Sequence, residues 1–175
     1  MLKKILLILA ALIAALLLFA ATRPNSYSVE RQVAIKAPPE KVFALIDSFP
    51  AWKSWSPYER LDPNMQRTVG GPPSGVGATY AWSGNSQAGA GSMRIIEATA
   101  PQRIVIQLEF TKPLVGHDTT TFLLSPRGDS TVVTWQVRGP NPYIAKLLTM
   151  FVPMDKMLGP QFEEGLGNLK RVAQQ

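Results

Sequence analysis

The sequence predicts an α+β domain in which a curved antiparallel sheet wraps around a long C-terminal helix, preceded by one transmembrane helix. Residues 5–21 contain no polar side chain. From Met65 to Arg138 the chain reads almost entirely as short strands, with turns recurring every ~8–12 residues as in an antiparallel meander. One face of such a sheet is apolar and must be covered, and only the C-terminal helix is long enough to cover it.

The apolar run, ILLILAALIAALLLFAA, follows Lys3 and Lys4. As a helix it spans ~26 Å at ~1.5 Å per residue, just short of a ~30 Å hydrocarbon core. It exceeds the ~7–15 apolar residues of a signal peptide and lacks a good small-x-small cleavage site. These features favour an anchor at residues 1–22 over a cleaved signal peptide, with a domain at residues 23–175.

Charge around the apolar run predicts its orientation. Two lysines precede it, whereas Arg23 alone lies just beyond it. The positive-inside rule then places the N-terminus in the cytoplasm and the domain on the extracytoplasmic side, which is periplasmic in a bacterium. We therefore expect a single-pass protein that contacts the membrane through residues 5–21.

Composition excludes several classes of function. The 175 residues carry a net charge of +6, one histidine and no cysteine. Lysine and arginine are scattered, whereas nucleic-acid-binding proteins gather them on one face. A zinc site needs several His, Cys or carboxylate ligands, and both G-x-G segments precede strands rather than the helix of a dinucleotide fingerprint. We expect no metal, no cofactor and no nucleic-acid partner.

The elements follow in order along the chain. Alternation predicts a strand at YSVERQVAIKAP, with Val29, Arg31, Val33 and Ile35 on one face. Pro39 suits the first turn of the helix PEKVFALID. The remaining predicted strands are MQRTV, GATYAWSGN, GSMRIIEAT, RIVIQLEFT, HDTTTFLLSP and STVVTWQVRG.

Helix is predicted for the C-terminal region. We expect Pro153 and Gly159-Pro160 to interrupt it, giving a short helix and then a longer one. Within the longer helix, Phe162, Leu166 and Leu169 recur at i, i+4 and i+7 and form an apolar stripe.

Four segments together resemble the START-like (SRPBCC) superfamily, within its polyketide-cyclase branch. They are IKAPPEKVFALIDSFPAWKSWSPYE, WSGN with GAGSM behind it, TTFLLSP with STVVTW, and MDKMLGPQFEEGLGNLKR. The resemblance covers residues 27–172. It implies a helix-grip fold, in which a curved sheet wraps the C-terminal helix around a hydrophobic cavity.

The resemblance also gives a place to the aromatic run FPAWKSWSPYE. Short helices after the first strand would plug one end of the curved sheet, with Phe49, Trp52 and Trp55 as an apolar wedge and Pro57 ending the helix. Core packing is the expectation for Trp52. For Trp55 and Tyr58, the mouth of the cavity and simple core packing both remain open.

Strand phase predicts the residues that line such a cavity. Inward positions alternate with outward ones, and methionines with aromatics make an adaptable apolar lining. Met150 and Met157 are also expected to face inward. The predicted ligand-binding residues are Trp55, Tyr80, Trp82, Met93, Ile106, Leu108, Phe110, Trp135, Met154 and Phe162.

No catalytic constellation is predicted. His117 is expected to be exposed at the start of a strand, and strand phase yields no inward pair of titratable groups. The first hypothesis is therefore a tethered domain that binds a hydrophobic small molecule or lipid. The alternatives are a cyclase- or hydratase-type enzyme, which needs perturbed titratable groups, and a protein-interaction module, which needs an exposed apolar patch.

Overall fold

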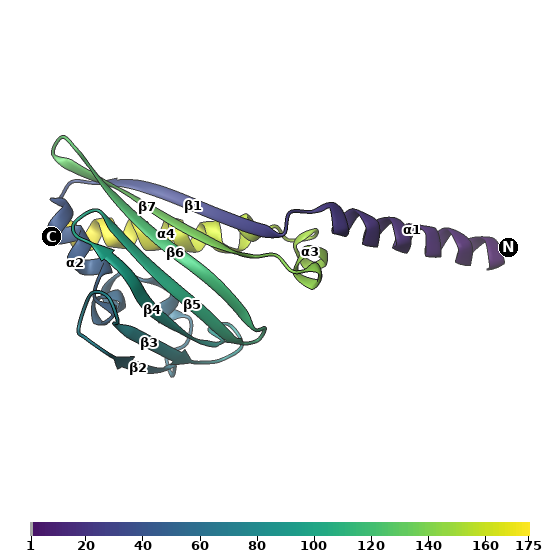
Figure 1. Ribbon diagram of the computed structural model, residues 1–175, viewed down its shortest axis with the longest axis horizontal. Helices are drawn as coiled ribbons and strands as arrows, with labels where there is room; N and C mark the ends of the chain where they lie inside the picture. The colour runs from purple at the N-terminus through teal and green to yellow at the C-terminus, as the bar shows by residue number, and fades with distance from the viewer. Residues whose placement is uncertain (1) are drawn as a thin grey trace.

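The computed structural model describes residues 2–175 and shows a long helix projecting from a domain of sheet and helix (Figure 1). Helix α1 (Leu2–Thr22) is separated from strand β1 (Ser26–Ile35) by residues 23–25 alone. In chain order the other elements are α2 (Pro39–Ile46), the 3₁₀ helices η1 (Phe49–Ser54) and η2 (Pro57–Arg60), β2 (Gln66–Gly70), β3 (Thr79–Ser83), β4 (Ala90–Thr99), β5 (Arg103–Lys112), β6 (Gly116–Arg127), β7 (Ser130–Pro140), α3 (Tyr143–Thr149) and α4 (Met154–Ala173).

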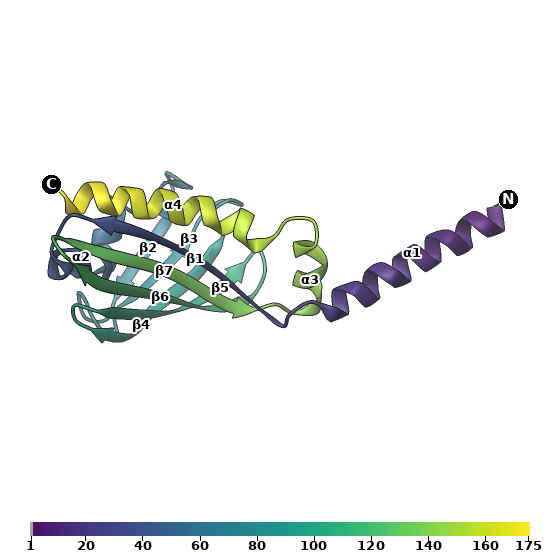
Figure 2. The ribbon, with the colours of Figure 1, turned by 90° about the horizontal axis from the view of Figure 1, so that it is seen from above.

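The strands form one antiparallel sheet in the order β1-β7-β6-β5-β4-β3-β2. Consecutive strands from β2 to β7 are neighbours, and β1 closes the order by pairing with β7 through Val29–Val137 and Val33–Val133. Helix α4 covers one face of this sheet, so that the domain has two layers (Figure 2). The predicted helix-grip fold is confirmed.

An ionic clamp fastens α4 to β1. Arg31 projects from the inward face of β1, as its phase predicted, and donates hydrogen bonds at 2.8 and 3.0 Å to Asp155 and at 2.7 Å to Glu163. The guanidinium passes over Gly159, where a Cβ atom would overlap it. Glycine at this helical position therefore has a steric reason.

The expected interruption of α4 at Gly159-Pro160 is wrong, because the helix runs through both residues. The clamp holds the helix on both sides of the proline, and burial of Phe162 and Leu166 holds the following turns. The expectation for Met157 is also wrong, since its side chain is exposed. The stripe continues one turn back from Phe162 to Leu158, which packs against the core and leaves Met157 outside it.

A bulge breaks the alternation of β4. The register with β5 shifts between Ile95 and Glu97, and Ile96 is left exposed. Ile95 is fully buried, whereas Glu97 forms an ion pair with Arg103 at 3.0 Å. Glu97 is only partly exposed, and the bulge brings it out of the core because an extra residue turns the strand.

Candidate ligand-binding site

An aromatic cluster fills the middle of the space between the sheet and α4. The indole of Trp135 stacks on Phe162 with ring centroids 4.2 Å apart and also contacts Phe122 at 5.0 Å. From the other side, Trp55 meets Trp135 edge-on at 5.7 Å and Trp52 at 4.9 Å. We call these five residues the aromatic cluster.

The segment after α2 delivers the two tryptophans of the cluster. Pro50 and Pro57 lie in the first turns of η1 and η2. The Trp52 indole N–H donates to the carbonyl of Ile46 at 2.8 Å, and the Trp55 N–H donates to that of Leu45 at 2.9 Å. Both indoles therefore lie against the end of α2 with their donors satisfied. Pro57 starts η2, so the expectation that it ends a helix is wrong.

Trp55 is fully buried, which favours core packing over the mouth of a cavity, the two alternatives left open for it. The other predicted residues with buried side chains are Tyr80, Met93, Ile106, Trp135 and Phe162. All six belong to one hydrophobic core cluster. Their role as ligand contacts remains a prediction.

Trp82, Leu108, Phe110 and Met154 are only partly buried, and we call this group the open end. Trp82 contacts Phe110 edge-on at 5.8 Å and donates its indole N–H to the carbonyl of Ala88 at 3.0 Å. A Cβ atom on Gly91 would meet the Trp82 ring at 2.7 Å, so this glycine leaves room for the indole beside β4.

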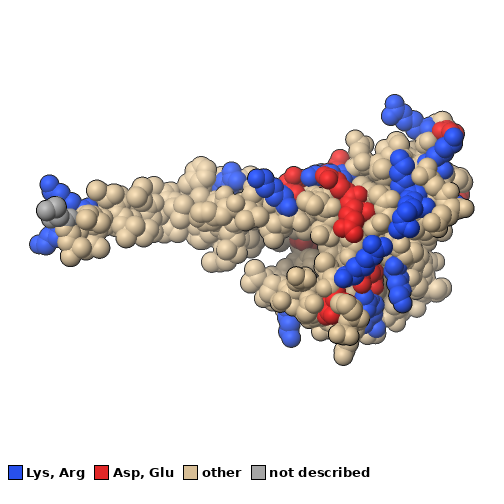
Figure 3. All heavy atoms as spheres, turned by 180° about the vertical axis from the view of Figure 1, so that it is seen from behind, with Lys and Arg blue, Asp and Glu red and all other residues tan. Residues whose placement is uncertain are grey.

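The strand register places the open end at the edge of the sheet nearest α1. This edge is formed by the ends of the strands and does not run along β1 or β2. β1 begins there, so β7 ends there, β6 begins there, and β5 and β3 end there. Leu108 pairs with Asp118 near the start of β6, and Trp82 pairs with Gly91 near the start of β4. Seen from the α4 side, the surface is hollowed between the part of the domain continuous with α1 and the strands below it (Figure 3).

A partly buried polar pair lies at the same edge. The Tyr27 hydroxyl donates to Asp118 at 2.6 Å. Burial raises the pKa of the Asp118 carboxyl above its usual range, and burial followed by the Asp118 contact raises the pKa of Tyr27. The nearby Tyr58, whose pKa is also raised by burial, adds to the shift at Tyr27. A Cβ on Gly139 would overlap both members of the pair, so glycine is needed beside them.

The expectation of no inward titratable pair is therefore wrong. Asp118 is in phase with Thr120 and Phe122, both buried on β6, and this phase was the available signal. Its partner Tyr27 could not be located without knowing that β1 lies beside β7. The aromatic cluster, farther in, holds the indole N–H of Trp135, a buried donor that has no hydrogen-bond partner among residues 2–175.

A second polar group locks η2 to the sheet. Glu59 has a side chain only 8% exposed, and it accepts from Arg67 at 2.6 Å and from the Tyr80 hydroxyl. Burial and then the contact with Glu59 raise the pKa of Tyr80. Since each member has a partner within the group, its evident effect is to hold η2 against β2 and β3.

Other chemistry finds no support in the part of the chain that the structure describes. Residues 2–175 contain no group of three His, Cys, Asp or Glu that could hold a metal ion. His117 is exposed, as predicted. The glycines of the two G-x-G segments include Gly75, Gly77 and Gly89 at positive φ, a backbone conformation typical of turns.

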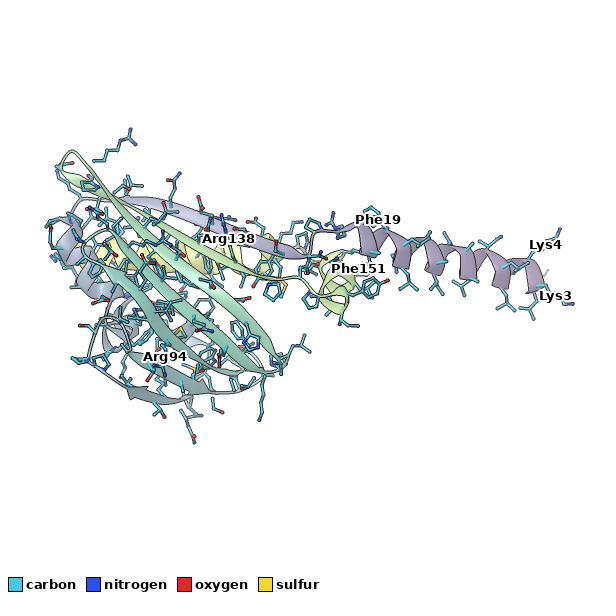
Figure 4. All side chains as sticks on the ribbon, in the orientation of Figure 1. Lys3, Lys4, Phe19, Arg94, Arg138 and Phe151 are labelled. Carbon is cyan, nitrogen blue, oxygen red and sulfur yellow. The ribbon has the colours of Figure 1, made fainter. Side chains whose placement is uncertain are left out.

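The outer face carries a separate groove of about 430 Å³ over β2 to β5. It is bordered by Thr79, Ser92, Arg94, Gln107 and Glu109, and Arg94 lies on this face in Figure 4. Polar and charged side chains make it a poor match for an apolar ligand, so it does not replace the inward site.

The family model "Polyketide cyclase / dehydrase and lipid transport" matches residues 26–174. No curated protein sequence matches the chain. Protein CV1439 of Chromobacterium violaceum is similar in structure, with a TM-score of 0.60, 18% identity, and coverage of 87% of this chain and 99% of that one.

Two further structures show the same fold at low identity. Hypothetical protein jhp0584 of Helicobacter pylori has a TM-score of 0.64 and 10% identity, covering 84% of this chain and 88% of its own. Major latex-like protein 151 of Panax ginseng has a TM-score of 0.61 and 12% identity, covering 86% and 99%.

Proposed function

The chain belongs to the polyketide cyclase, dehydrase and lipid transport family, and from this premise we propose that it is a membrane-tethered domain that binds a hydrophobic small molecule or lipid. The site lies between the sheet and α4, at the open end. One observation carries the proposal: large apolar side chains on the inward face are fully buried at the aromatic cluster but incompletely covered at the open end. Incompletely covered apolar surface in a concave site is what an apolar ligand buries.

The polar groups beside the open end define the ligand further. Asp118, Tyr27 and Tyr58 lie at one edge of it, and the N–H of Trp135, farther in within the aromatic cluster, is a donor without a partner among residues 2–175. A few polar groups in an otherwise apolar site fix the orientation of a ligand. We expect a ligand with an apolar body and one polar end that exchanges hydrogen bonds with this group.

The tether is proposed from α1. This helix has a mean hydropathy of 2.9 and is long and apolar enough to cross a membrane. Lys3 and Lys4 lie at its far end from the domain (Figure 4). By the positive-inside rule, this charge pattern supports a cytoplasmic N-terminus and a domain on the extracytoplasmic side.

A fusion tests the tether and its orientation. A reporter that is active only in an oxidising compartment, joined after Gln175, should be active. An inactive fusion would overturn the orientation. The mass of the mature protein tests retention, because an N-terminus near Thr22 would establish a cleaved signal peptide in place of an anchor.

Photocrosslinking tests the binding site in the full chain. Membranes containing the protein are supplied with a fatty acid that carries a diazirine near the end of its chain, irradiated, and digested for peptide mapping. We expect labelled peptides from α1, which lies in lipid, and also from the open end. Leu108→Trp should fill the site and reduce the second set several-fold, whereas Leu123→Trp on the outer face should not.

Labelling confined to α1 would refute an inward site. Equal labelling of the open end in the Leu108→Trp variant would also refute it, because adding an indole there must exclude a ligand. The α1 peptides serve as the internal control for delivery of the probe to the membrane.

An enzyme of the cyclase or hydratase kind is the second candidate, and the Tyr27–Asp118 pair favours it. A buried carboxyl with a raised pKa beside a substrate site is a candidate proton donor or acceptor. Asp118→Asn should then abolish turnover of the molecule that co-purifies with the protein while leaving its binding intact. Unchanged turnover by the variant, or no conversion by the wild type, would refute the enzymatic function and leave only the proposed binding function.

A further inference from the structure

Helix α3 is fastened to the end of α1. The Tyr143 hydroxyl donates to the carbonyl of Leu17 at 2.8 Å, inside the apolar run, and Ala20 is fully buried at this contact between helices. Below it, the Asn141 N–H donates to the carbonyl of Asn25 at 2.7 Å, and the Lys146 ammonium donates to the Asn25 side chain at 2.7 Å. These hydrogen bonds join the segment before β1 to the segment after β7.

Beyond this contact, α3 and the loop after it expose apolar side chains. Ile144, Leu148, Phe151 and Val152 are 64%, 57%, 75% and 50% exposed. Ile144 and Leu148 lie at i and i+4 on one face of α3, and Phe151 and Val152 follow in the turn after the helix. Phe151 lies at the junction of α1 and the domain, near Phe19 (Figure 4).

The connection between β5 and β6 adds to this surface at the same edge of the sheet. Its Leu114 and Val115 are 63% and 78% exposed. Together with the four side chains of α3 and its loop, they form what we call the apolar rim. Apolar patches of this kind on a protein surface mark sites of contact with a membrane or partner.

The segments that form the apolar rim carry basic but no acidic side chains. Residues 110–117 and 138–153 contain no aspartate or glutamate, and Lys112 and Arg138 in them are exposed, whereas Lys146 is buried against Asn25. Apolar side chains flanked by lysine and arginine match the surface of an anionic bilayer, where apolar groups enter the acyl boundary and cations meet lipid phosphates.

The position of α1 indicates that a bilayer covers this surface. The apolar run ends at Ala21, and α3 packs against its last turns, so any bilayer that holds α1 meets α3 at its boundary. Tyrosine is enriched at that depth, and Tyr143 lies there. Residues 23–25 leave little slack for the domain to turn away.

Resting on the proposed tether, we infer that the apolar rim inserts into the interface of the bilayer that α1 spans. The open end lies at the same edge of the sheet. The domain therefore docks with its ligand opening towards lipid, and an apolar ligand passes between site and bilayer without crossing water.

Single cysteines test this, because the chain has none of its own. The full chain is reconstituted into vesicles of phosphatidylcholine and phosphatidylglycerol, with an environment-sensitive nitrobenzoxadiazole label at one position. Leu148→Cys and Val115→Cys report on the rim, Leu9→Cys on α1, and Arg127→Cys on the β6–β7 turn at the opposite end of the sheet. Quenching is measured with nitroxide lipids and with aqueous iodide.

We expect nitroxide lipids labelled near the headgroup to quench the rim labels, and iodide to quench only the label at position 127. Rim labels quenched by iodide as strongly as that label, while the α1 label is quenched by lipid, would overturn the inference and leave the tether intact. Rim labels shielded from both quenchers would overturn it in favour of a protein partner. An α1 label insensitive to lipid would overturn the tether and the inference together, whereas the photocrosslinking of the inward site would still decide ligand binding.

Discussion

The aromatic cluster and the open end belong to one inward face, yet they are packed differently. In the aromatic cluster, Trp135 has aromatic neighbours on several sides and stacks on Phe162 from α4. At the open end, Phe110 has one aromatic neighbour, Trp82, and remains partly exposed. The difference separates two states of apolar side chains in one fold: the first region is closely packed, and the second leaves apolar surface that the proposed ligand would cover.

The largest expected effect is at the aromatic cluster. Trp135→Ala should lower the free energy of unfolding by ~3–5 kcal/mol, the usual cost of a large void in a packed core. Urea denaturation of the full chain in mild detergent, followed by circular dichroism, measures it. A cost near that of an exposed substitution would mean that the cluster is loosely packed and that the two regions do not differ.

A smaller loss is expected at the open end. Phe110→Ala should cost only ~1–2 kcal/mol, because some contacts of this ring are already missing in the unliganded protein. The same variant should label more weakly with the photoreactive fatty acid. If Phe110→Ala costs as much as Trp135→Ala and labelling is unchanged, the open end is ordinary core.

A pH dependence distinguishes the polar edge of the open end. Since burial raises the pKa of Asp118 above its ordinary value of 3.8, the folded state binds its proton more tightly than the unfolded state. Its contribution to stability is therefore greatest below pH 3.8 and falls as the pH rises through the higher folded pKa. Asp118→Asn removes this titration and leaves an oxygen that can accept from Tyr27.

The measurement compares the unfolding free energies of wild type and Asp118→Asn across acidic and neutral pH. The difference between wild type and variant should decline with rising pH and then level off. A flat difference would show that Asp118 is solvated like an ordinary surface carboxyl.

The smallest effect on the unfolding free energy is expected at His117. His117 lies next to Asp118 but points to the outer face and is exposed. His117→Ala should change the unfolding free energy by no more than ~0.5 kcal/mol, as exposed substitutions usually do. A larger change in the same denaturation experiment would mean that the outer face of β6 has a partner or function.

Strand phase predicted much of this inward face from the sequence. Ile106, Val133 and Trp135 were assigned inward by alternation and are buried. Phase works on these strands because one side of a sheet is covered by α4 and the other is not. It cannot rank burial along a strand, so it could not separate Trp135 from Phe110.

The errors arise where position depends on packing between elements. Trp55 is buried because η1 and η2 dock on the end of α2, which the spacing of its aromatic run does not reveal. Glu59 reaches Tyr80 and Arg67 only once η2 lies on the sheet. Gly159 and Pro160 read as helix breakers, but the first makes room for Arg31 and the helix continues through both.

The short junction between α1 and β1 has a consequence for transport. Three residues reach ~10 Å at most when fully extended, at ~3.3–3.6 Å per residue, and Asn141 and Lys146 bind within this segment. On the proposed tether, a domain held so closely to α1 cannot carry a ligand to a facing membrane. The proposed site would take a molecule from the leaflet beside it, and onward transfer would then need a second carrier that comes to this surface.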